Sequence, residues 1–303
     1  MPQTANIAIL HEQINSWYTE AARNLPWRIP PEQWPWPDVD RPWAILVSEV
    51  MLQQTPVARV EPIWHEWIRR WPTPANLAVA SPGEAVREWK RLGYPRRALR
   101  LHAAASTVVT DHAGIIPSDF QQLQALPGIG IYTAAAVEAF AFGIRSVVID
   151  TNVRRVQARL VTGVAQAAPR LTTAETQLAN SMLPADEVTT AVWNVAVMEL
   201  GALICTVSAP ACDRCPVRDR CVWVHAGRPT YDGPVKRVQK WAGTDRQVRG
   251  KLLQVLRDAH APVSRHYLDM VWHDTAQRNR CLTSLIEDGL IEIVDVEKFR
   301  LPN

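Results

Sequence analysis

The stretch "LPGIGIYTAAAV", from Leu126 to Val137, shapes how the rest of the sequence is interpreted. Gly128 and Gly130 form a tight turn that leads directly into apolar residues at helical spacing. Such a turn directs successive backbone N–H groups outward at the positively polarised start of a helix, which makes an anion site. No lysine of a nucleotide-binding loop follows, so a phosphate of a nucleic-acid backbone is a more natural ligand than a nucleoside triphosphate. A tight connection without any ligand is the alternative.

Helical periodicity predicts a mainly α fold for the chain. Apolar residues at helical spacing, bounded by Pro, Gly or a capping Ser, predict helices over 11–22, 43–55, 58–71, 81–93, 96–112, 118–126, 133–143, 151–163, 173–183 and 189–205. Gly143 is the expected C-cap of the helix that follows the glycine turn. Only 145–150 and the last twelve residues look like strands. Three helices are expected over 245–259, 264–272 and 275–289, and a hairpin over 290–302, in an order that resembles a winged helix.

Composition is that of a soluble protein with a sizeable core. The chain has 303 residues, of which 47% are hydrophobic and 21% charged, and its formal net charge is +3. No apolar run reaches the ~18 residues of a membrane span, and the N-terminus lacks the features of a secretory signal. We therefore expect a cytoplasmic protein without membrane association. Between Arg214 and Arg257 there are eleven Lys/Arg against three Asp/Glu. This basic stripe could follow phosphates or be a solvated linker.

Four of the five cysteines lie within seventeen residues. Cys205, Cys212, Cys215 and Cys221 have the spacing C-x6-C-x2-C-x5-C. In a cytoplasmic protein this clustering indicates a metal site and not disulfides. Four thiolates can hold a tetrahedral zinc ion or a cubane iron–sulfur cluster, and the spacing alone does not separate the two. Cys281 stands alone in an apolar helical stretch and is expected in the core.

Two carboxylates are candidates for chemistry. Asp150 precedes the helix that begins at Thr151, so it is an expected N-cap, and this role does not exclude a catalytic one. Glu49 lies within "WAILVSEVMLQQT", a helix that is otherwise apolar. Burial disfavours the charged form of a glutamate, so Glu49 could serve as an acid near neutral pH. If Glu49 faces water instead, this argument fails.

Together these motifs resemble the helix-hairpin-helix DNA glycosylases. "LPGIGIYT" followed by "VIDTNVRRV" matches the Gly/Pro-rich loop and aspartate of that superfamily, and the cysteine window matches the cluster loop of its endonuclease III and MutY branches. "LPWR" (25–28), "SEVMLQQT" (48–55) and "LGY" (92–94) resemble the adenine DNA glycosylase (MutY) family specifically. The resemblance covers about residues 10–227. It implies a [4Fe-4S] cluster in place of zinc, and removal of adenine mispaired with 8-oxoguanine or guanine in double-stranded DNA by a monomeric enzyme.

The resemblance also implies roles for individual residues. After the adenine is flipped from the duplex, Glu49 would protonate it at N7 and Asp150 would stabilise the oxocarbenium-like sugar cation. Tyr132 stands where bifunctional relatives carry the lysine that forms a Schiff base, which implies a monofunctional glycosylase. The remaining implied site residues are Asn152 beside Tyr132 for the sugar and water, Arg28, Leu52 and Glu199 for the adenine pocket, Gln54 and Tyr94 for wedging beside the opposing base, and Gly128 and Gly130 for a DNA phosphate.

The expected layout has three parts. These are a glycosylase domain over 1–227, made of a helical barrel (25–143) and an iron–sulfur subdomain (1–24 with 144–227), a basic linker over 228–244, and a winged-helix-like α+β unit over 245–303. The family's NUDIX-like C-terminal domain is expected to be missing, and "LGYP" replaces the usual "LGYY". In the C-terminal unit, Arg278 and Arg280 are expected to face DNA, whereas the acidic residues of the hairpin make it a poor phosphate binder. A packing role for this unit is the alternative.

Two other functions remain open. The first is a thymine glycosylase of the same superfamily acting on T:G mismatches, which can also carry Tyr at position 132. Those enzymes tend to have arginines where this chain has Gln53 and Gln54, and they lack Tyr94. The second is a DNA-binding protein with a structural metal and no chemistry, which the presence of both Glu49 and Asp150 disfavours.

Overall fold

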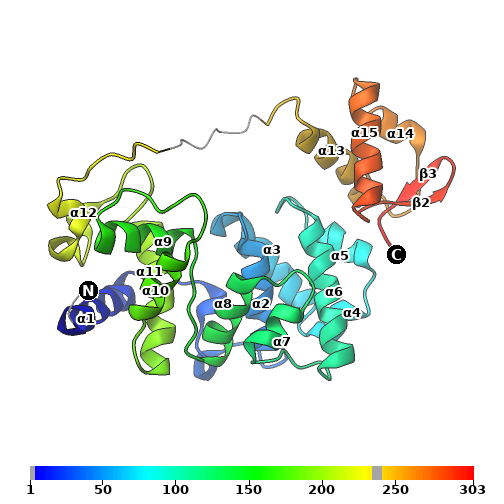
Figure 1. Cartoon of the computed structure of the whole chain (residues 1–303). Coiled ribbons are helices and arrows are strands. Elements are labelled where there is room, and N and C mark those ends of the chain that lie inside the picture. The colour runs from blue at the N-terminus through cyan, green and yellow to red at the C-terminus, as the bar shows by residue number, and fades with distance from the viewer. Residues whose placement is uncertain (1–3, 234–240) are drawn as a thin grey trace. The chain divides into compact units, whose positions relative to one another are not determined.

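The computed structural model describes residues 4–233 and 241–303, with the side chains of residues 4–6 left aside. The chain is mainly helical, as the sequence predicts (Figure 1). It forms two compact units. Within the described residues, unit 1 draws on 4–30, 118–124 and 129–233, and unit 2 on 31–117, 125–128 and 241–303. In the described part of the chain, no helix has the length and apolar character needed to cross a membrane.

Unit 1 is entirely helical in its described part. Its elements are α1 (Thr4–Ala21), η1 (Pro26–Arg28), most of α7 (Phe120–Ala125), α8 (Ile131–Phe142), α9 (Thr151–Gln157), the π-helical turn η3 (Ala158–Thr162), α10 (Thr173–Ser181), α11 (Glu187–Leu203), η4 (Cys212–Arg214), η5 (Arg218–Arg220) and α12 (Val222–His225). Its core packs α1, α9 and α11 together, with Ile14, Val156 and Trp193 buried among them. The segment 205–221 lies on the same core, since Cys212 and Cys221 are members of that cluster.

The segment that begins α8 behaves as its sequence predicts. Gly130 is the N-cap, and Gly143 is the C-cap with φ 70°, a left-handed conformation that glycine adopts without strain. Asp150 is the N-cap of α9 and accepts the Val153 backbone N–H at 2.7 Å. The prediction of a strand over 145–150 is wrong. This segment pairs with no strand among the described residues, and side chains of unit 1 hold it instead, including Asn194, which donates to the Ser146 carbonyl at 2.9 Å.

The first part of unit 2 is also helical. Its elements are η2 (Pro31–Gln33), α2 (Arg41–Leu52), α3 (Val57–Arg70), α4 (Pro74–Ala78), α5 (Pro82–Glu88) and α6 (Arg96–Asp111). Helix α4 was not expected, because five residues are too few to show a helical period. Tryptophans join the helices: Trp43, Trp64 and Trp67 are buried, and each indole N–H donates to a backbone carbonyl at 2.8–2.9 Å. These three tryptophans therefore pack the core and also link it to the backbone.

The C-terminal part of unit 2 combines helices with a small sheet. Its elements are α13 (Asp245–Asp258), β1 (Val263–Ser264), α14 (Arg265–Asp269), α15 (Thr275–Glu287), β2 (Glu292–Asp295) and β3 (Lys298–Arg300). The sheet is antiparallel with the order β1-β3-β2, so the predicted hairpin is confirmed and β1 adds an edge strand that the sequence did not reveal. Cys281 is buried in this part, as expected. Residues 234–240 of the expected basic linker over 228–244 lie outside the described residues.

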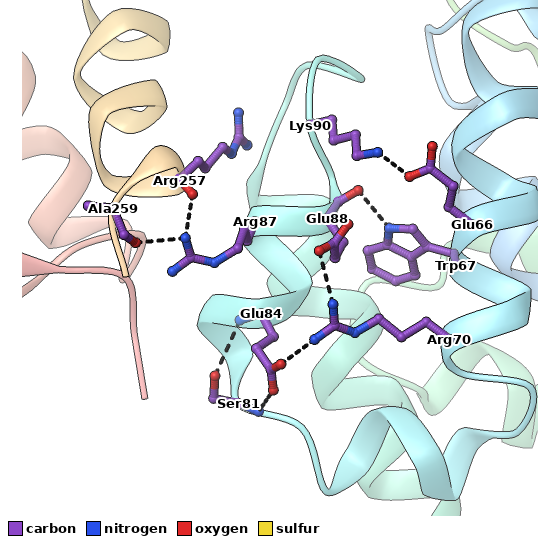
Figure 2. A network of polar contacts seen from close by, with 10 residues as sticks. All are labelled: Glu66, Trp67, Arg70, Ser81, Glu84, Arg87, Glu88, Lys90, Arg257 and Ala259. Carbon is purple, nitrogen blue, oxygen red and sulfur yellow. Dashed lines mark hydrogen bonds and ion pairs between the residues drawn. The ribbon is translucent and has the colours of Figure 1, made fainter. Parts of the chain in front are cut away.

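Specific contacts dock the C-terminal part on α5. Arg87 donates to the carbonyls of Arg257 and Ala259, the latter at 2.7 Å, as Figure 2 shows. Arg257 in turn donates to the Val86 carbonyl at 2.9 Å, and the Gly83 N–H donates to the Pro302 carbonyl at 2.6 Å. These contacts place residues 245–303 in the same compact unit as α2–α6. The domain boundaries expected from the sequence stay a prediction.

Arg278 and Arg280 do not both face solvent as expected. Arg278 is only 8% exposed and pairs with Asp269 at 3.0 Å. It shares the buried face of α15 with Cys281 and Leu285, because residues three and four apart lie on one side of a helix. Arg280 is exposed but pairs with Asp245 at 2.9 Å. The prediction that Arg278 contacts DNA is therefore wrong.

Candidate functional site

The glycine turn leaves the start of α8 accessible. Gly128 has φ 79° and Gly130 caps the helix without any side-chain hydrogen bond. Both glycines and Ile131 are exposed, so the first backbone N–H groups of α8 are open to a ligand. A Cβ at position 128 would lie 2.6 Å from the Arg100 Cβ, which explains why glycine is required there. This geometry suits an anion at a helix N-terminus.

Asp150 is held by two N–H donors at the start of α9. Its two carboxylate oxygens accept the Val153 backbone N–H and the Asn152 side-chain amide, each at 2.7 Å. Burial raises the pKa of Asp150, although both hydrogen bonds favour its charged form. Asn152 is itself fixed, because its Oδ1 accepts from Arg155 at 2.7 Å. Asp150 and Asn152, both expected as site residues, are thus joined by a direct hydrogen bond that the sequence analysis did not foresee.

Glu199 forms a buried ion-pair cluster with two arginines. Its side chain is 0% exposed and accepts from Arg23 Nε and Nη2 at 2.7 Å and from Arg28 Nη2 at 2.9 Å. Burial by itself would raise the pKa of Glu199, but the hydrogen bonds from Arg23 and Arg28 lower it to about 2. Arg28 Nη1 is buried and finds no acceptor among the described residues. The cluster therefore holds a fixed carboxylate and presents one N–H group that a bound ligand could use.

The other expected residues near the chemistry occupy two helices. Tyr132 lies in the first turn of α8 and packs, half-buried, against a small cluster that includes Ala136 and Val148. Glu49 is on α2 and only 5% exposed, so the alternative that it faces water is excluded. Leu52 is half-buried at the end of the same helix. Glu49 and Leu52 belong to unit 2, whereas Tyr132 belongs to unit 1.

Gln54 and Tyr94 stand on two loops of unit 2 that share a brace. Both have left-handed backbones, with φ 55° and 47°, which are uncommon for residues other than glycine. Both are exposed, and they line one hollow of about 360 Å³ together with Arg96 and Arg249. Strained residues that are also exposed are a mark of functional sites.

Buried Arg97 supplies that brace. It donates to the carbonyls of Val50, Met51 and Gln53 at 2.6–3.0 Å, and on the other loop to those of Leu92 and Gly93 at 3.0–3.2 Å. Burial lowers its pKa to about 10, so the guanidinium stays charged at neutral pH. One cation therefore fixes the distance between the loops that carry the two expected wedge residues.

The four clustered cysteines are free thiols in one neighbourhood. Burial, together with the negative charges of Cys205, Cys221 and Cys212, raises the pKa of Cys215 to about 11. Cys212 and Cys221 belong to one core cluster and Cys205 and Cys215 pack against it, so the four thiols lie in one region of unit 1. Within residues 4–233 and 241–303, no three His, Cys, Asp or Glu side chains converge so as to hold a single metal ion.

Two buried arginines lie against the cysteine segment. Arg155 donates to the Cys205 carbonyl at 2.7 Å, and Arg159 reaches the Cys205 sulfur at 3.4 Å and the Thr206 carbonyl at 2.7 Å. They are 8% and 3% exposed, and their hydrogen-bond acceptors in the described structure are carbonyl, amide and thiol groups. Two buried cations next to four thiols favour an anionic group at this position.

The structure adds functional residues that the sequence did not reveal. These are Arg23 beside Glu199, Arg97 beneath the two loops, and Arg155 and Arg159 beside the cysteines. The pair at 155 and 159 had a readable signal, because a spacing of four places both on the same helix face as apolar core residues. The sequence carries no such signal for Arg23 and Arg97. Glu199, the partner of Arg23, is 176 residues away in the chain, and the partners of Arg97 are up to 47 residues away.

Residues 47–180 match the sequence profile of the HhH-GPD superfamily of base excision DNA repair proteins. The adenine DNA glycosylase of Mycobacterium tuberculosis is 50% identical over 288 residues, which cover 95% of this chain and 91% of the relative. That of Mycolicibacterium smegmatis is 50% identical over 291 residues, covering 95% and 94%. The human adenine DNA glycosylase is 39% identical over 224 residues, covering 72% of this chain and 40% of the relative.

The chain belongs to the adenine DNA glycosylase family. It is accordingly a DNA N-glycosylase of base excision repair. The match to the mycobacterial members extends through nearly the whole chain, so it includes residues of the C-terminal part of unit 2.

Solved structures support the fold. A thermostable thymine-DNA glycosylase has a TM-score of 0.64 and 25% identity, covering 73% of this chain and 97% of that one. A non-covalent endonuclease III–DNA complex has a TM-score of 0.61 and 19% identity, covering 75% and 99%. The 19% identity to the endonuclease III chain supports a shared fold and nothing more. The twofold higher identity to adenine glycosylases disfavours the thymine-specific alternative.

Proposed function

We propose that this enzyme removes adenine mispaired with 8-oxoguanine or guanine from double-stranded DNA, by acid-catalysed hydrolysis of the N-glycosidic bond. The observation that carries the adenine assignment is the cluster of Glu199 with Arg23 and Arg28. The charged Glu199 carboxylate holds Arg28 in place, and the unused Arg28 Nη1 can donate to a ring nitrogen of the flipped base. Leu52 supplies apolar contact to the ring. We propose a monomer that acts in the cytoplasm.

In the proposed mechanism two carboxylates divide the chemistry. Glu49, buried on an apolar helix, holds the proton that it gives to adenine N7, which turns the base into a good leaving group. Asp150 stabilises the sugar cation that develops as the bond breaks, and Asn152 keeps it oriented through their hydrogen bond. Tyr132 and Asn152 support the sugar and the attacking water.

Two further sets of residues would bind the duplex. The exposed N–H groups that follow Gly128 and Gly130 bind a backbone phosphate. Gln54 and Tyr94 insert beside the base that opposes the adenine, and the brace of Arg97 keeps the two loops at a fixed separation. Tyr132 has no amine to form a Schiff base, so strand cleavage does not follow excision.

We further propose that Cys205, Cys212, Cys215 and Cys221 hold a [4Fe-4S] cluster. Four free thiols in one neighbourhood, with buried Arg155 and Arg159 beside them, fit a group of net negative charge. Four thiolates can also hold a zinc ion, and the iron–sulfur cluster is proposed because the cysteine spacing resembles the cluster loop of the endonuclease III and MutY branches. The cluster would be structural here, because it ties the segment 205–221 to the core of unit 1. Iron analysis checks this: about four iron atoms per chain are expected, and one zinc per chain would contradict it.

Single-turnover excision tests the proposed function. Excess enzyme is mixed with duplexes containing A:8-oxoguanine, A:G, A:T or T:G, and release of the base is followed by alkaline cleavage of the abasic strand. We expect fast release of adenine from the first two duplexes and little release from the others. Faster release of thymine from T:G would show that the thymine-specific alternative is correct. Binding without release from any duplex would show a non-catalytic DNA-binding protein.

A further inference from the structure

Tyr94 is held on its aromatic face by an arginine from the C-terminal part of unit 2. The Arg246 guanidinium carbon lies 4.8 Å from the centre of the Tyr94 ring, and the Arg97 guanidinium carbon lies 5.6 Å from it. Both distances lie within the range of cation–π contacts. Arg246 also lies 5.5 Å from the Trp241 ring, so its guanidinium is positioned between two aromatic side chains. Tyr94 therefore has one brace from its own loop and a second from α13.

The position of Arg246 is fixed by the docking of its helix. Arg87 holds the end of α13 through the carbonyls of Arg257 and Ala259, as Figure 2 shows. At the other end of the docked part, Gly83 meets the Pro302 carbonyl so closely that a Cβ would lie 2.3 Å from that oxygen. The acceptors are all backbone carbonyls, and the contact between Gly83 and Pro302 is backbone to backbone. Helix α13 is thus docked on α5 and is not merely tethered to it.

A third set of contacts lies beside Tyr94 itself. Asp288, at the end of α15, pairs with Arg96 of α6 at 3.1 Å and with Arg249 of α13 at 2.5 Å. These residues line the same hollow as Gln54 and Tyr94. The hollow has four arginines on its wall against one carboxylate, so it keeps a net positive charge that suits a DNA strand.

A tyrosine that is strained and exposed needs support to stay in place. Its φ of 47° is unfavourable for an aromatic residue, and its side chain is 45% exposed. Without a neighbour on the face of the ring, the side chain would sample other rotamers and the loop could relax. A planar guanidinium over the face of the ring restricts its motion, and Tyr94 still lines the hollow.

We propose that Arg246 is a positioning residue for Tyr94, through which residues 245–303 take part in reading the base opposite the adenine. This inference rests on the proposed function only in the identity of that base. It predicts that removing the guanidinium weakens recognition of the mispair and leaves the chemical step intact, because Arg246 touches Tyr94 and none of the residues proposed for chemistry.

The test measures unstacking separately from excision. A duplex carries an abasic site in place of the adenosine, with 2-aminopurine next to the opposing base, so that its fluorescence rises when the stack is opened. The wild-type chain, Arg246→Ala, Arg246→Lys, Tyr94→Ala and the control Arg300→Ala are titrated against it. Arg300 lies in the same C-terminal part and pairs with Glu292, so its replacement removes the same charge away from Tyr94. Single-turnover excision at saturating enzyme and thermal unfolding are recorded for each variant.

We expect the fluorescence rise to disappear in Tyr94→Ala and to weaken in Arg246→Ala. Affinity for the A:8-oxoguanine duplex should fall about two- to fivefold in Arg246→Ala, the range expected for an exposed cation–π contact. Arg246→Lys should restore part of both, since it keeps the charge without the planar face, and Arg300→Ala should match the wild type. The saturating excision rate and the melting temperature should stay the same in Arg246→Ala.

Two results would overturn the inference. The first is an Arg246→Ala variant with wild-type unstacking and affinity. The second is an equal loss of unstacking and affinity in Arg246→Ala and Arg300→Ala. That result would show that the effect comes from the net charge of the C-terminal part and not from contact with Tyr94. A wild-type chain that excises no adenine contradicts the proposed function instead, and it leaves the unstacking comparison interpretable because the abasic duplex needs no excision.

Discussion

The two carboxylates of unit 1 that belong to the proposed site, Glu199 and Asp150, are in opposite electrostatic surroundings. Glu199 is fully buried between two guanidinium groups, which lower its pKa to about 2. Asp150 accepts only N–H groups of neutral amides, and burial raises its pKa. A group that recognises a base must keep one charge at all times. A carboxylate that stabilises a transient cation is more effective when few positive groups neutralise its charge before that cation forms.

Unit 2 is stabilised at its C-terminal part by a different principle. There, Arg87 and Gly83 contact backbone carbonyls, and the fit depends on shape more than on paired charges. Charge pairs such as Arg300 with Glu292 lie at the surface of this part. The pair of Asp288 with Arg96 is one charge pair that joins this part to α6. The comparison predicts that acid will weaken the Glu199 cluster and leave the backbone contacts of Arg87 and Gly83 intact.

The largest effect is expected at Glu49, the buried carboxylate on α2. Glu49→Gln keeps the shape of the side chain but cannot donate the proton, so single-turnover excision should fall by about 10²–10⁴-fold. DNA affinity should remain within about twofold, because the substitution leaves the DNA-binding residues unchanged. Glu12→Gln, an exposed substitution on α1, is the control and should behave as the wild type. Excision within tenfold of the wild type would remove Glu49 from the role of acid.

Glu199→Gln tests the fixed carboxylate. Since the folded-state pKa is lowered to about 2, ionised Glu199 contributes stability above its unfolded pKa near 4.5, and this contribution is lost as the pH falls through 2. Urea unfolding at pH 7 should show a loss of about 3 kcal/mol, and the difference from the wild type should shrink in acid. Glu292→Gln breaks an exposed pair and should cost less than about 1 kcal/mol. Equal losses of unfolding free energy in Glu199→Gln and Glu292→Gln would contradict the difference expected between a buried and an exposed ion pair.

The Gly83→Ala variant tests the close backbone contact between Gly83 and Pro302, which helps to dock the C-terminal part on α5. The added Cβ would lie 2.3 Å from the Pro302 carbonyl oxygen, so the chain end must move, at a cost of about 1–3 kcal/mol in unfolding free energy. Gly250→Ala is the matched control, because nothing lies within 4 Å of its Cβ on α13. That variant should gain about 0.5–1 kcal/mol from helix propensity. A neutral Gly83→Ala variant would show that this contact is dispensable.

The smallest effect concerns pH and Asp150. Excision requires its charged form, and the raised pKa means that protonation starts at a higher pH than for an ordinary aspartate. The single-turnover rate should therefore fall on acidification with a midpoint above about 3.9, the usual aspartate value. The residual rate of Asp150→Asn should lack this acid limb. A wild-type rate that stays flat down to pH 4 would contradict the raised pKa.

The sequence by itself determined the elements and the chemistry-bearing motifs. Local signals sufficed for the cap at Gly143, the cap at Asp150 and the helix start at Gly130, because each depends on residues only a few positions apart. The burial of Glu49 followed from the apolar residues around it on one helix. The family followed from motifs whose residue types and spacing serve one chemistry. The strand expected over 145–150 failed for the opposite reason, since a strand needs a partner that its own sequence does not specify.

Only the tertiary structure decided which charges meet. Arg23 with Glu199, Arg97 with the loops of Gln54 and Tyr94, and Arg246 with Tyr94 join residues far apart in the chain. An arginine in a sequence looks the same whether it will face DNA or fill the core, and Arg278 shows this, because its place on the buried face of α15 was settled by packing. Desolvation and long-range pairing set the energy of a charge, and neither is encoded in the residues next to it.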